Sequence, residues 1–201
     1  MGKREEEGGF QGDGTSSFGG IVGVVHAINA VSSNAGIETL GGSDAAVSAI
    51  ELADFNNLMA RLPAYADTPR TKFYMHKSVY HAAAERLAFD KGSTTQMIFD
   101  GQATPTFFGY PVEFTQVMPT QATADGTSAD LDLRYPILFG DLALASAFGD
   151  RRDNTISFSD SALNAFEQDE IVVRATERFD YVCHSPGTSS EAGPVVAMKL
   201  D

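Results

Sequence analysis

The chain has 201 residues, 43% of them hydrophobic, which is enough for one sizeable core or two small subdomains. Acidic residues outnumber basic ones by 27 to 14, and the resulting net charge of -13 disfavours sequence-specific binding to a nucleic acid. No apolar run approaches the roughly 20 residues that span a bilayer, which argues against a membrane protein. The single cysteine, Cys183, excludes an internal disulfide and a cysteine-based metal cluster.

The chain begins with a charged leader and a glycine-rich turn. Residues 1–9 contain no apolar stretch of the kind found in a secretory signal, and we expect them to be an unstructured leader or an added end. Residues 10–20 are dense in turn formers and lack the residues that would complete a phosphate-binding or calcium-binding loop, so a plain turn is favoured. Residues 21–28 are apolar and predict a short buried strand or a turn of helix.

The only long, uninterrupted helical pattern covers residues 43–62. Ser43 is a good N-cap, and a proline follows the last residue of the pattern. The apolar side chains form one broad arc at 100° per residue, interrupted by polar residues. We therefore expect a helix over residues 43–62 that packs on more than one side and is exposed around Ile50, Glu51 and Asp54.

The middle of the chain has the pattern of a strand-helix-strand unit. Residues 71–75 alternate as a strand, and a serine N-cap begins a helix predicted over residues 78–89. Residues 107–114 are the next apolar stretch, and Pro111 places them at a strand edge or a strand start. Residues 118–132 have the composition of a long loop.

The last third of the chain is rich in predicted strands. They cover residues 136–141 with a β-rich continuation to residue 148, residues 155–158, residues 170–183 and residues 195–200. The stretch at 170–183 is the longest of these candidates. The chain has no repeat of fixed period.

Residues with catalytic or metal-binding chemistry are scattered. The four histidines, His26, His76, His81 and His184, are far apart or at the wrong helical offset to share a metal ion. Cys183 and His184 are adjacent and point to opposite faces of a strand, so they do not form a nucleophile and base pair. The motifs of serine hydrolases, zinc proteases, P-loop proteins and dinucleotide-binding proteins do not occur. We therefore predict no catalytic, cofactor-binding or metal-binding site.

One acidic patch leaves an enzymatic alternative open. Asp160, Glu167, Asp169 and Glu170 could serve a small hydrolase or bind a cation. A solvated turn is the better interpretation, because these acids precede a strand without the spacing of metal ligands.

Several short motifs follow one another along the chain. They are Phe10-Gln11-Gly12-Asp13-Gly14-Thr15 with Gly20-Ile21, the helix at 43–62, Phe73-Tyr74-Met75-His76 with the helix after it, Phe108-Gly109-Tyr110-Pro111-Val112, Phe139-Gly140-Asp141, and two closing stretches at 151–158 and 174–186. In their order and spacing they resemble the C-terminal part of the major capsid proteins of tailed bacteriophages, the Hong Kong 97 type. The match runs from Phe10 to Leu200.

The resemblance implies an α+β fold with a long spine helix, peripheral and axial subdomains, and mixed or antiparallel sheets. Residues 10–70, with the spine helix at 43–62, would form the peripheral domain, residues 71–190 the axial domain, and residues 191–201 a returning peripheral strand. The family implies a viral structural protein without enzymatic activity. It would self-assemble in the bacterial host cytoplasm into pentamers, hexamers and the icosahedral virion shell around phage or prophage DNA. Portal, scaffold or decoration proteins would be further partners.

The N-terminus departs from the family pattern. Family members carry an arm and an extended loop before the Gly-Asp-Gly-Thr turn, whereas about ten residues precede it here. We therefore expect a chain without these two elements. Two other functions stay open: an encapsulin-like compartment shell of the same fold, and the small hydrolase with its acidic patch near Glu167 to Glu170.

Overall fold

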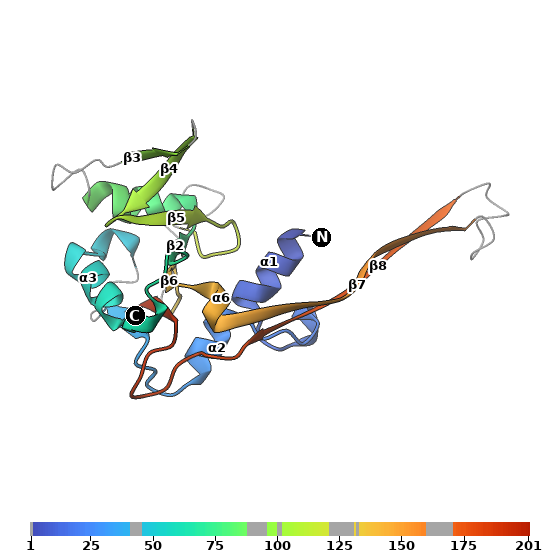
Figure 1. Ribbon diagram of the computed structural model, residues 1–201, viewed down its shortest axis with the longest axis horizontal. Coiled ribbons are helices and arrows are strands. Elements are labelled where there is room, and N and C mark those ends of the chain that lie inside the picture. Colours follow the sequence, from blue (N-terminus) through green and yellow to red (C-terminus); the bar gives the residue numbers. More distant parts are fainter. Residues whose placement is uncertain are drawn as a thin grey trace.

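A seven-stranded mixed sheet forms the centre of the body, and a separate two-stranded ribbon projects from it (Figure 1). The computed structural model describes residues 2–40, 46–87, 96–99, 102–120, 131, 133–159 and 171–201. The strands of the sheet lie in the order β1-β9-β6-β2-β5-β4-β3. Their bounds are β1 Ile37–Leu40, β2 Lys72–Met75, β3 Gln96–Phe99, β4 Gln102–Phe107, β5 Tyr110–Phe114, β6 Ile137–Gly140 and β9 Val195–Leu200. The combination of helices with mixed and antiparallel pairing confirms the predicted α+β class.

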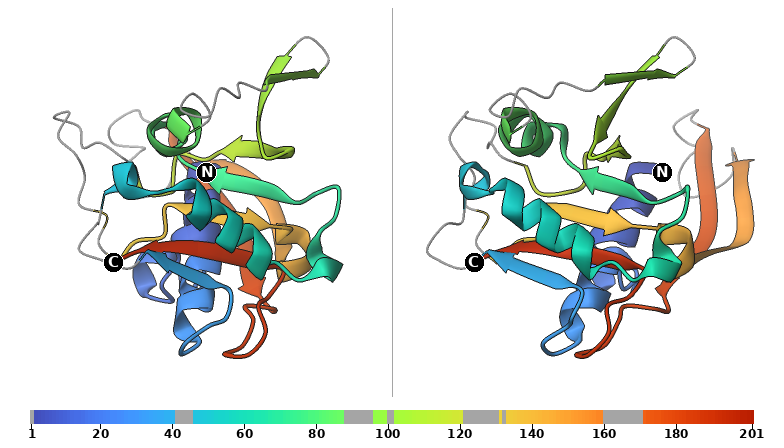
Figure 2. Two further views of the ribbon diagram at one scale, coloured as in Figure 1. Left: turned by 90° about the vertical axis from the view of Figure 1, so that its left-hand side faces the viewer. Right: turned by 60° about the vertical axis from the view of Figure 1, so that its left-hand side comes forward.

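Short helices cover both faces of the sheet. Figure 2 shows α3 on one face, and α1 and α2 on the other. The helical segments are α1 Gly2–Gln11, η1 Ser16–Phe18, α2 Val24–Ala30, η2 Val47–Ala49, α3 Leu52–Arg61, η3 Ala64–Ala66, α4 Lys77–Val79, η4 Tyr80–Glu85 and α6 Leu142–Ala145. Residues 21–28, predicted as a strand or a turn of helix, therefore contain the start of a helix.

Strand β9 is buried on both faces, as its nearly unbroken apolar sequence predicts. Val196 and Met198 pack in the hydrophobic cluster that contains the buried residues of α3. Val195 and Ala197 point the other way and pack with the buried residues of α2. Because side chains alternate along a strand, β9 ties the two layers of helices to one sheet.

Aromatic rings fill the core between α3 and the sheet. Phe73 stacks on Phe139 with ring centroids 4.4 Å apart, and Phe55 of α3 meets Phe107 edge to face at 4.7 Å. All four side chains are buried. These contacts fix α3 and the hairpin of β4 and β5 on the sheet.

The predicted strand-helix-strand unit is confirmed. Strands β2 and β5 run parallel, with Phe73 opposite Val112, and the chain between them contains α4 and its π-helical continuation η4. The predicted serine N-cap is wrong, because His76 caps the helix. Its ring accepts a hydrogen bond from the backbone N–H of Ser78 at 3.1 Å, so Ser78 lies in the first turn.

The long helix predicted over residues 43–62 is wrong in its first half. Helix α3 begins at Leu52 and has ten residues, whereas Ile50 is extended. The start is set by a reciprocal cap, in which Glu51 accepts from the first turn and its own N–H donates to the carboxylate of Asp54 at 2.7 Å. This cap replaces the predicted one at Ser43, which lies outside the described residues. The spine role assigned to this helix stays a prediction.

The exposure predicted around the start of this helix is only partly right. Glu51 is exposed, as predicted, whereas Asp54 is half-buried. Ile50 is fully buried, so its predicted exposure is wrong. The short turn of η2 points Ile50 into the core, which the helical periodicity did not indicate.

The expectation of an unstructured leader at residues 1–9 is also wrong, because α1 covers Gly2–Gln11. Phe10 packs against Tyr74 of the sheet with ring centroids 5.9 Å apart. A Cβ added at Gly8 would lie 3.4 Å from the Ile21 side chain, so this side of the helix is closely packed. The run of charged residues at 3–7 dominates this part of the sequence, so the few apolar contacts of the helix were not predicted.

The remaining elements agree with the sequence in most places. Pro111 is the second residue of β5, which is the strand start that was predicted. The β-rich continuation after residue 141 is interrupted by α6, where Asp141 accepts a hydrogen bond from the backbone N–H of Ala143 at 2.9 Å. The predicted loop at 118–132 lies largely outside the described residues. The peripheral and axial division of the chain stays a prediction.

Candidate functional site

The feature that sets this chain apart from an ordinary α+β domain is its ribbon. Strands β7 Ser146–Ser159 and β8 Val172–Cys183 form a separate antiparallel sheet that extends far from the body (Figure 1). The predicted strands at 155–158 and 170–183 are confirmed, and the first is longer than expected. Register shifts between Asp150 and Thr155 mark bulges, which bend and twist such a ribbon.

The outer half of the ribbon has one apolar face. Ile156 lies opposite Ala175, and Phe158 lies opposite Val173. Directly opposed residues share a face, so these four side chains form a continuous apolar strip, here called the ribbon face. The alternate positions carry polar pairs such as Ser157 with Arg174.

Nothing in the described part of the chain covers the ribbon face. Phe158 is 71% exposed, Ile156 59% and Val173 58%. An isolated two-stranded ribbon is marginally stable in water, and a continuous exposed apolar strip marks an interaction surface. The sequence predicted these strands from the alternation of apolar and polar residues. Such alternation is typical of a strand with one buried face, so the exposure of the ribbon face was not predicted.

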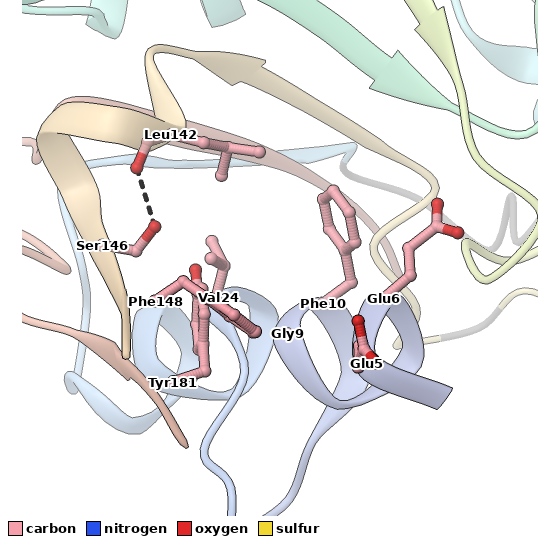
Figure 3. A pocket seen from close by; sticks show the side chains of 9 residues that line it. All are labelled: Glu5, Glu6, Gly9, Phe10, Val24, Leu142, Ser146, Phe148 and Tyr181. Atoms are coloured by element: carbon pink, nitrogen blue, oxygen red, sulfur yellow. Dashed lines mark hydrogen bonds between the residues drawn. The ribbon is translucent and has the colours of Figure 1, made fainter. Parts of the chain in front are cut away.

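A cavity of about 350 Å³ lies at the base of the ribbon, beside α1 (Figure 3). Apolar side chains line most of it, from α1, α2, α6 and the first residues of the ribbon, and the carboxylates of Glu5 and Glu6 lie at its α1 side. The lining residues are Glu5, Glu6, Gly9, Phe10, Val24, Leu142, Ser146, Phe148 and Tyr181. This cavity was not predicted from the sequence, because residues 1–9 were expected to be unstructured.

The hairpin between β4 and β5 carries a strained aromatic residue. Phe107 pairs with Tyr110, so Phe108 and Gly109 form a two-residue turn with positive φ angles of 52° and 84°. This is a type I′ turn, which favours Asn-Gly, and a bulky residue at its first position costs about 1–3 kcal/mol. Phe108 is 44% exposed, so its own burial offsets only part of that cost.

Two tyrosines near the ribbon base, Tyr181 and Tyr74, have raised pKa values. Burial raises the pKa of Tyr181 to about 12, although a hydrogen bond with Ser146 partly offsets this increase. Burial also raises the pKa of Tyr74 to about 12, with the charges of Asp141 and Glu113 adding to the shift. Both phenols therefore stay protonated at neutral pH and cannot act as general bases.

The single thiol has the same character. Cys183 is half-buried, and burial raises its pKa above the ordinary value. A raised pKa keeps the thiol protonated and a poor nucleophile at neutral pH.

The structure does not bring the histidines together into a site. His76 caps a helix, His81 bonds Glu85 four residues along the same helix, and His184 lies beside Ser185. Among the described residues no group of three or more His, Cys, Asp or Glu side chains could hold a metal ion.

The Gly-Asp-Gly-Thr stretch forms the plain turn that was favoured. The carboxylate of Asp13 accepts hydrogen bonds from the backbone N–H of Thr15 at 2.9 Å and from its hydroxyl at 2.6 Å. These bonds lower the pKa of Asp13. The carboxylate thus stabilises its own turn.

Two further expectations concern an enzyme and a membrane. The acidic patch of Asp160, Glu167, Asp169 and Glu170 lies outside the described residues. In the described ranges, no helix combines the length and apolarity required to cross a bilayer.

Comparisons with solved structures show what fold this is. A protein of Mycobacterium phage Bobi is 19% identical, with a TM-score of 0.61, and the alignment covers 100% of this chain and 61% of that chain. The capsid of an empty GTA particle is 14% identical, with a TM-score of 0.61 and coverage of 98% and 60%. The holo-SrpI encapsulin complex from Synechococcus elongatus PCC 7942 is 12% identical, with a TM-score of 0.62 and coverage of 99% and 61%.

At these identities the likeness shows the fold, and it confirms the Hong Kong 97 type of architecture. The chain spans about three fifths of the length of these similar structures, since it covers 60% or 61% of each. A search of curated protein sequences gives no match. A family model described as the phage capsid family, however, matches residues 1–186. Because this match covers most of the chain, the protein belongs to the phage capsid family.

Proposed function

We propose that this chain is the shell-forming part of a major capsid protein, which self-assembles into pentamers, hexamers and the icosahedral shell of a virion around phage or prophage DNA. Its role is structural rather than enzymatic. Membership of the phage capsid family supports this role. The observation that carries it is the ribbon face, an apolar strip on a projecting arm that the described residues of one copy leave in water.

The ribbon face is suited to contact between copies of one chain. Interfaces bury aromatic and aliphatic side chains and deplete charged ones, and the strip has four exposed apolar residues and no charged one. A projecting arm reaches past its own body, so it meets a neighbour. Portal, scaffold or decoration proteins would then bind the assembled shell.

A compartment shell with protein cargo is the second candidate. It is favoured by the similarity to an encapsulin complex, at a TM-score of 0.62. The two functions differ in what the particle encloses, so nuclease-protected DNA in purified particles would indicate a virion, and co-purified protein cargo would indicate a compartment. Family membership gives the hydrolase alternative no support.

The proposed assembly can be tested at the ribbon face. We expect the purified wild-type chain to form large particles on concentration, seen by sedimentation velocity and electron microscopy. The double variant Ile156→Ser with Phe158→Ser should shift half-assembly to a concentration at least about tenfold higher, because it removes two apolar anchors. The monomer should stay folded, since both side chains are exposed.

Ser157→Thr is the matched control, because it changes a polar position on the opposite face of the same strand. It should assemble like the wild-type chain. A double variant that assembles at the wild-type concentration would show that the ribbon face is not the contact.

A further inference from the structure

Phe108 adopts a backbone conformation that a bulky residue disfavours, and within its own copy its ring packs edge to face on Phe107 with centroids 4.6 Å apart while 44% of the residue stays exposed. A type I′ turn favours asparagine at the position that Phe108 occupies with its φ of 52°. Isolated exposed apolar residues are common and need no explanation, but a strained and exposed aromatic residue does. Its neighbour Phe107 is buried in the core, so the turn presents Phe108 on a rigid support.

The cavity beside α1 has the size and the apolar lining to receive an aromatic side chain such as Phe108. Its volume of about 350 Å³ exceeds that of a phenylalanine side chain, and its walls are largely apolar. Figure 3 shows Phe10 and Leu142 on its walls, with Glu5 and Glu6 at the α1 side. The positive edge of an aromatic ring is compatible with such carboxylates. No residue of β4, β5 or their turn lines this cavity, so a copy does not fill it with its own Phe108.

We propose that Phe108 of one copy inserts into the cavity beside α1 of a second copy. This inference rests on the proposed shell function and gives it a second contact, separate from the ribbon face. Phe108, here called the knob, and the cavity lie on different elements, so the contact is heterologous. Each copy offers the knob to one neighbour and the cavity to another. Heterologous contacts of this kind close into rings when the rotation between copies permits.

Two substitutions test both sides of the contact. Phe108→Asn removes the knob and supplies the residue that a type I′ turn favours. Gly9→Leu places a side chain in the cavity and replaces a helical glycine with a better helix former. A Cβ at Gly9 would meet only Tyr181 ring atoms at 3.8 Å, which is ordinary contact.

Both variants should therefore unfold at a higher temperature than the wild-type chain and yet assemble less readily. We expect each to raise the concentration at half-assembly by about tenfold or more, as the loss of an interface anchor does. Sedimentation velocity gives the assembly and thermal denaturation the stability. A residue that only stabilised its own copy would not move these two measurements in opposite directions.

The matched controls are Phe108→Leu, which keeps an apolar knob, and Gly9→Ala, which raises helix propensity without filling the cavity. Both should assemble within about threefold of the wild-type chain. Wild-type assembly in every one of the variants would overturn the knob and cavity contact and leave the shell function standing. Lower stability of Phe108→Asn would also overturn it, because packing within one copy would then explain the residue. A wild-type chain that stays monomeric would contradict both proposals.

Discussion

Asp141 shows at the scale of a single residue how the ribbon is anchored. Asp141 is 1% exposed, and its carboxylate accepts hydrogen bonds from Thr68 Oγ1 at 2.7 Å, Arg70 Nε at 3.2 Å and the Ala143 backbone N–H at 2.9 Å. Burial alone would raise its pKa, but the bonds from Thr68 and Ala143 and the charge of Arg70 lower it. Because α6 leads directly into β7, this carboxylate links the body to the root of the ribbon.

Asp141→Asn should lower the free energy of unfolding by about 2–3 kcal/mol, because charge-assisted hydrogen bonds in a buried site are lost. Urea denaturation measures the change. Glu113→Gln is the control, since Glu113 pairs with Lys72 at an exposed site and the loss should stay below about 1 kcal/mol. Equal losses in the two variants would contradict the role of Asp141.

The same residue makes a pH prediction. The pKa of Asp141 is lower in the folded than in the unfolded chain, so its stabilisation is fully present above the unfolded value, which is about 4. The stabilisation is lost as the pH falls through the folded pKa. The stability difference between the wild-type chain and Asp141→Asn should therefore shrink below about pH 4 in urea titrations. A difference that is constant from pH 6 to pH 2.5 would contradict it.

At the scale of elements, the sequence predicted strands better than helices. The strands at 195–200 and 170–183 follow from their β-branched and apolar residues, which agree with their place in the structure. The helix over 43–62 failed because a cap at Glu51 overrides a helical period that continues through residues 46–50. The ribbon face could not be predicted, because alternation indicates which residues share a face but not whether another layer covers it.

Helix α1 was not predicted from the sequence, because it is stabilised by a few contacts with distant parts of the chain rather than by a local helical pattern. Phe10 is its main aromatic contact with the sheet, and it is half-buried. Phe10→Ala should lower the free energy of unfolding by about 2 kcal/mol, less than a fully buried phenylalanine costs, and should speed hydrogen exchange in α1. Glu7→Ala, at an exposed position of the same helix, should change neither. Unchanged exchange in the Phe10 variant would show that α1 does not depend on this contact.

At the scale of the whole molecule, charge opposes association and apolar contact favours it. Each copy carries a net charge of -13, so copies repel one another at low ionic strength. The Debye length falls from about 10 Å at 0.1 M salt to about 3 Å at 1 M, which screens this repulsion. The ribbon face and the knob are apolar, so salt leaves their attraction intact.

Raising sodium chloride from 0.1 M to 1 M should therefore lower the concentration at half-assembly by about threefold or more. Light scattering across a concentration series measures it. The ribbon double variant should show the same trend from a weaker starting point, since its charge is unchanged. Assembly that weakens with salt would instead point to ion pairs as the main contact between copies.

The position of β9 also governs when the body can form during synthesis. It pairs with β1 on one side and β6 on the other, yet the ribosome makes it more than 150 residues after β1. Until residues 195–200 emerge, β1 and β6 lack the strand that lies between them in the folded sheet. The ribbon, by contrast, joins strands near each other in the chain and can form earlier. In nascent chains the ribbon would thus be folded before the seven-stranded sheet is complete. Chaperones would be needed in this state to prevent premature association.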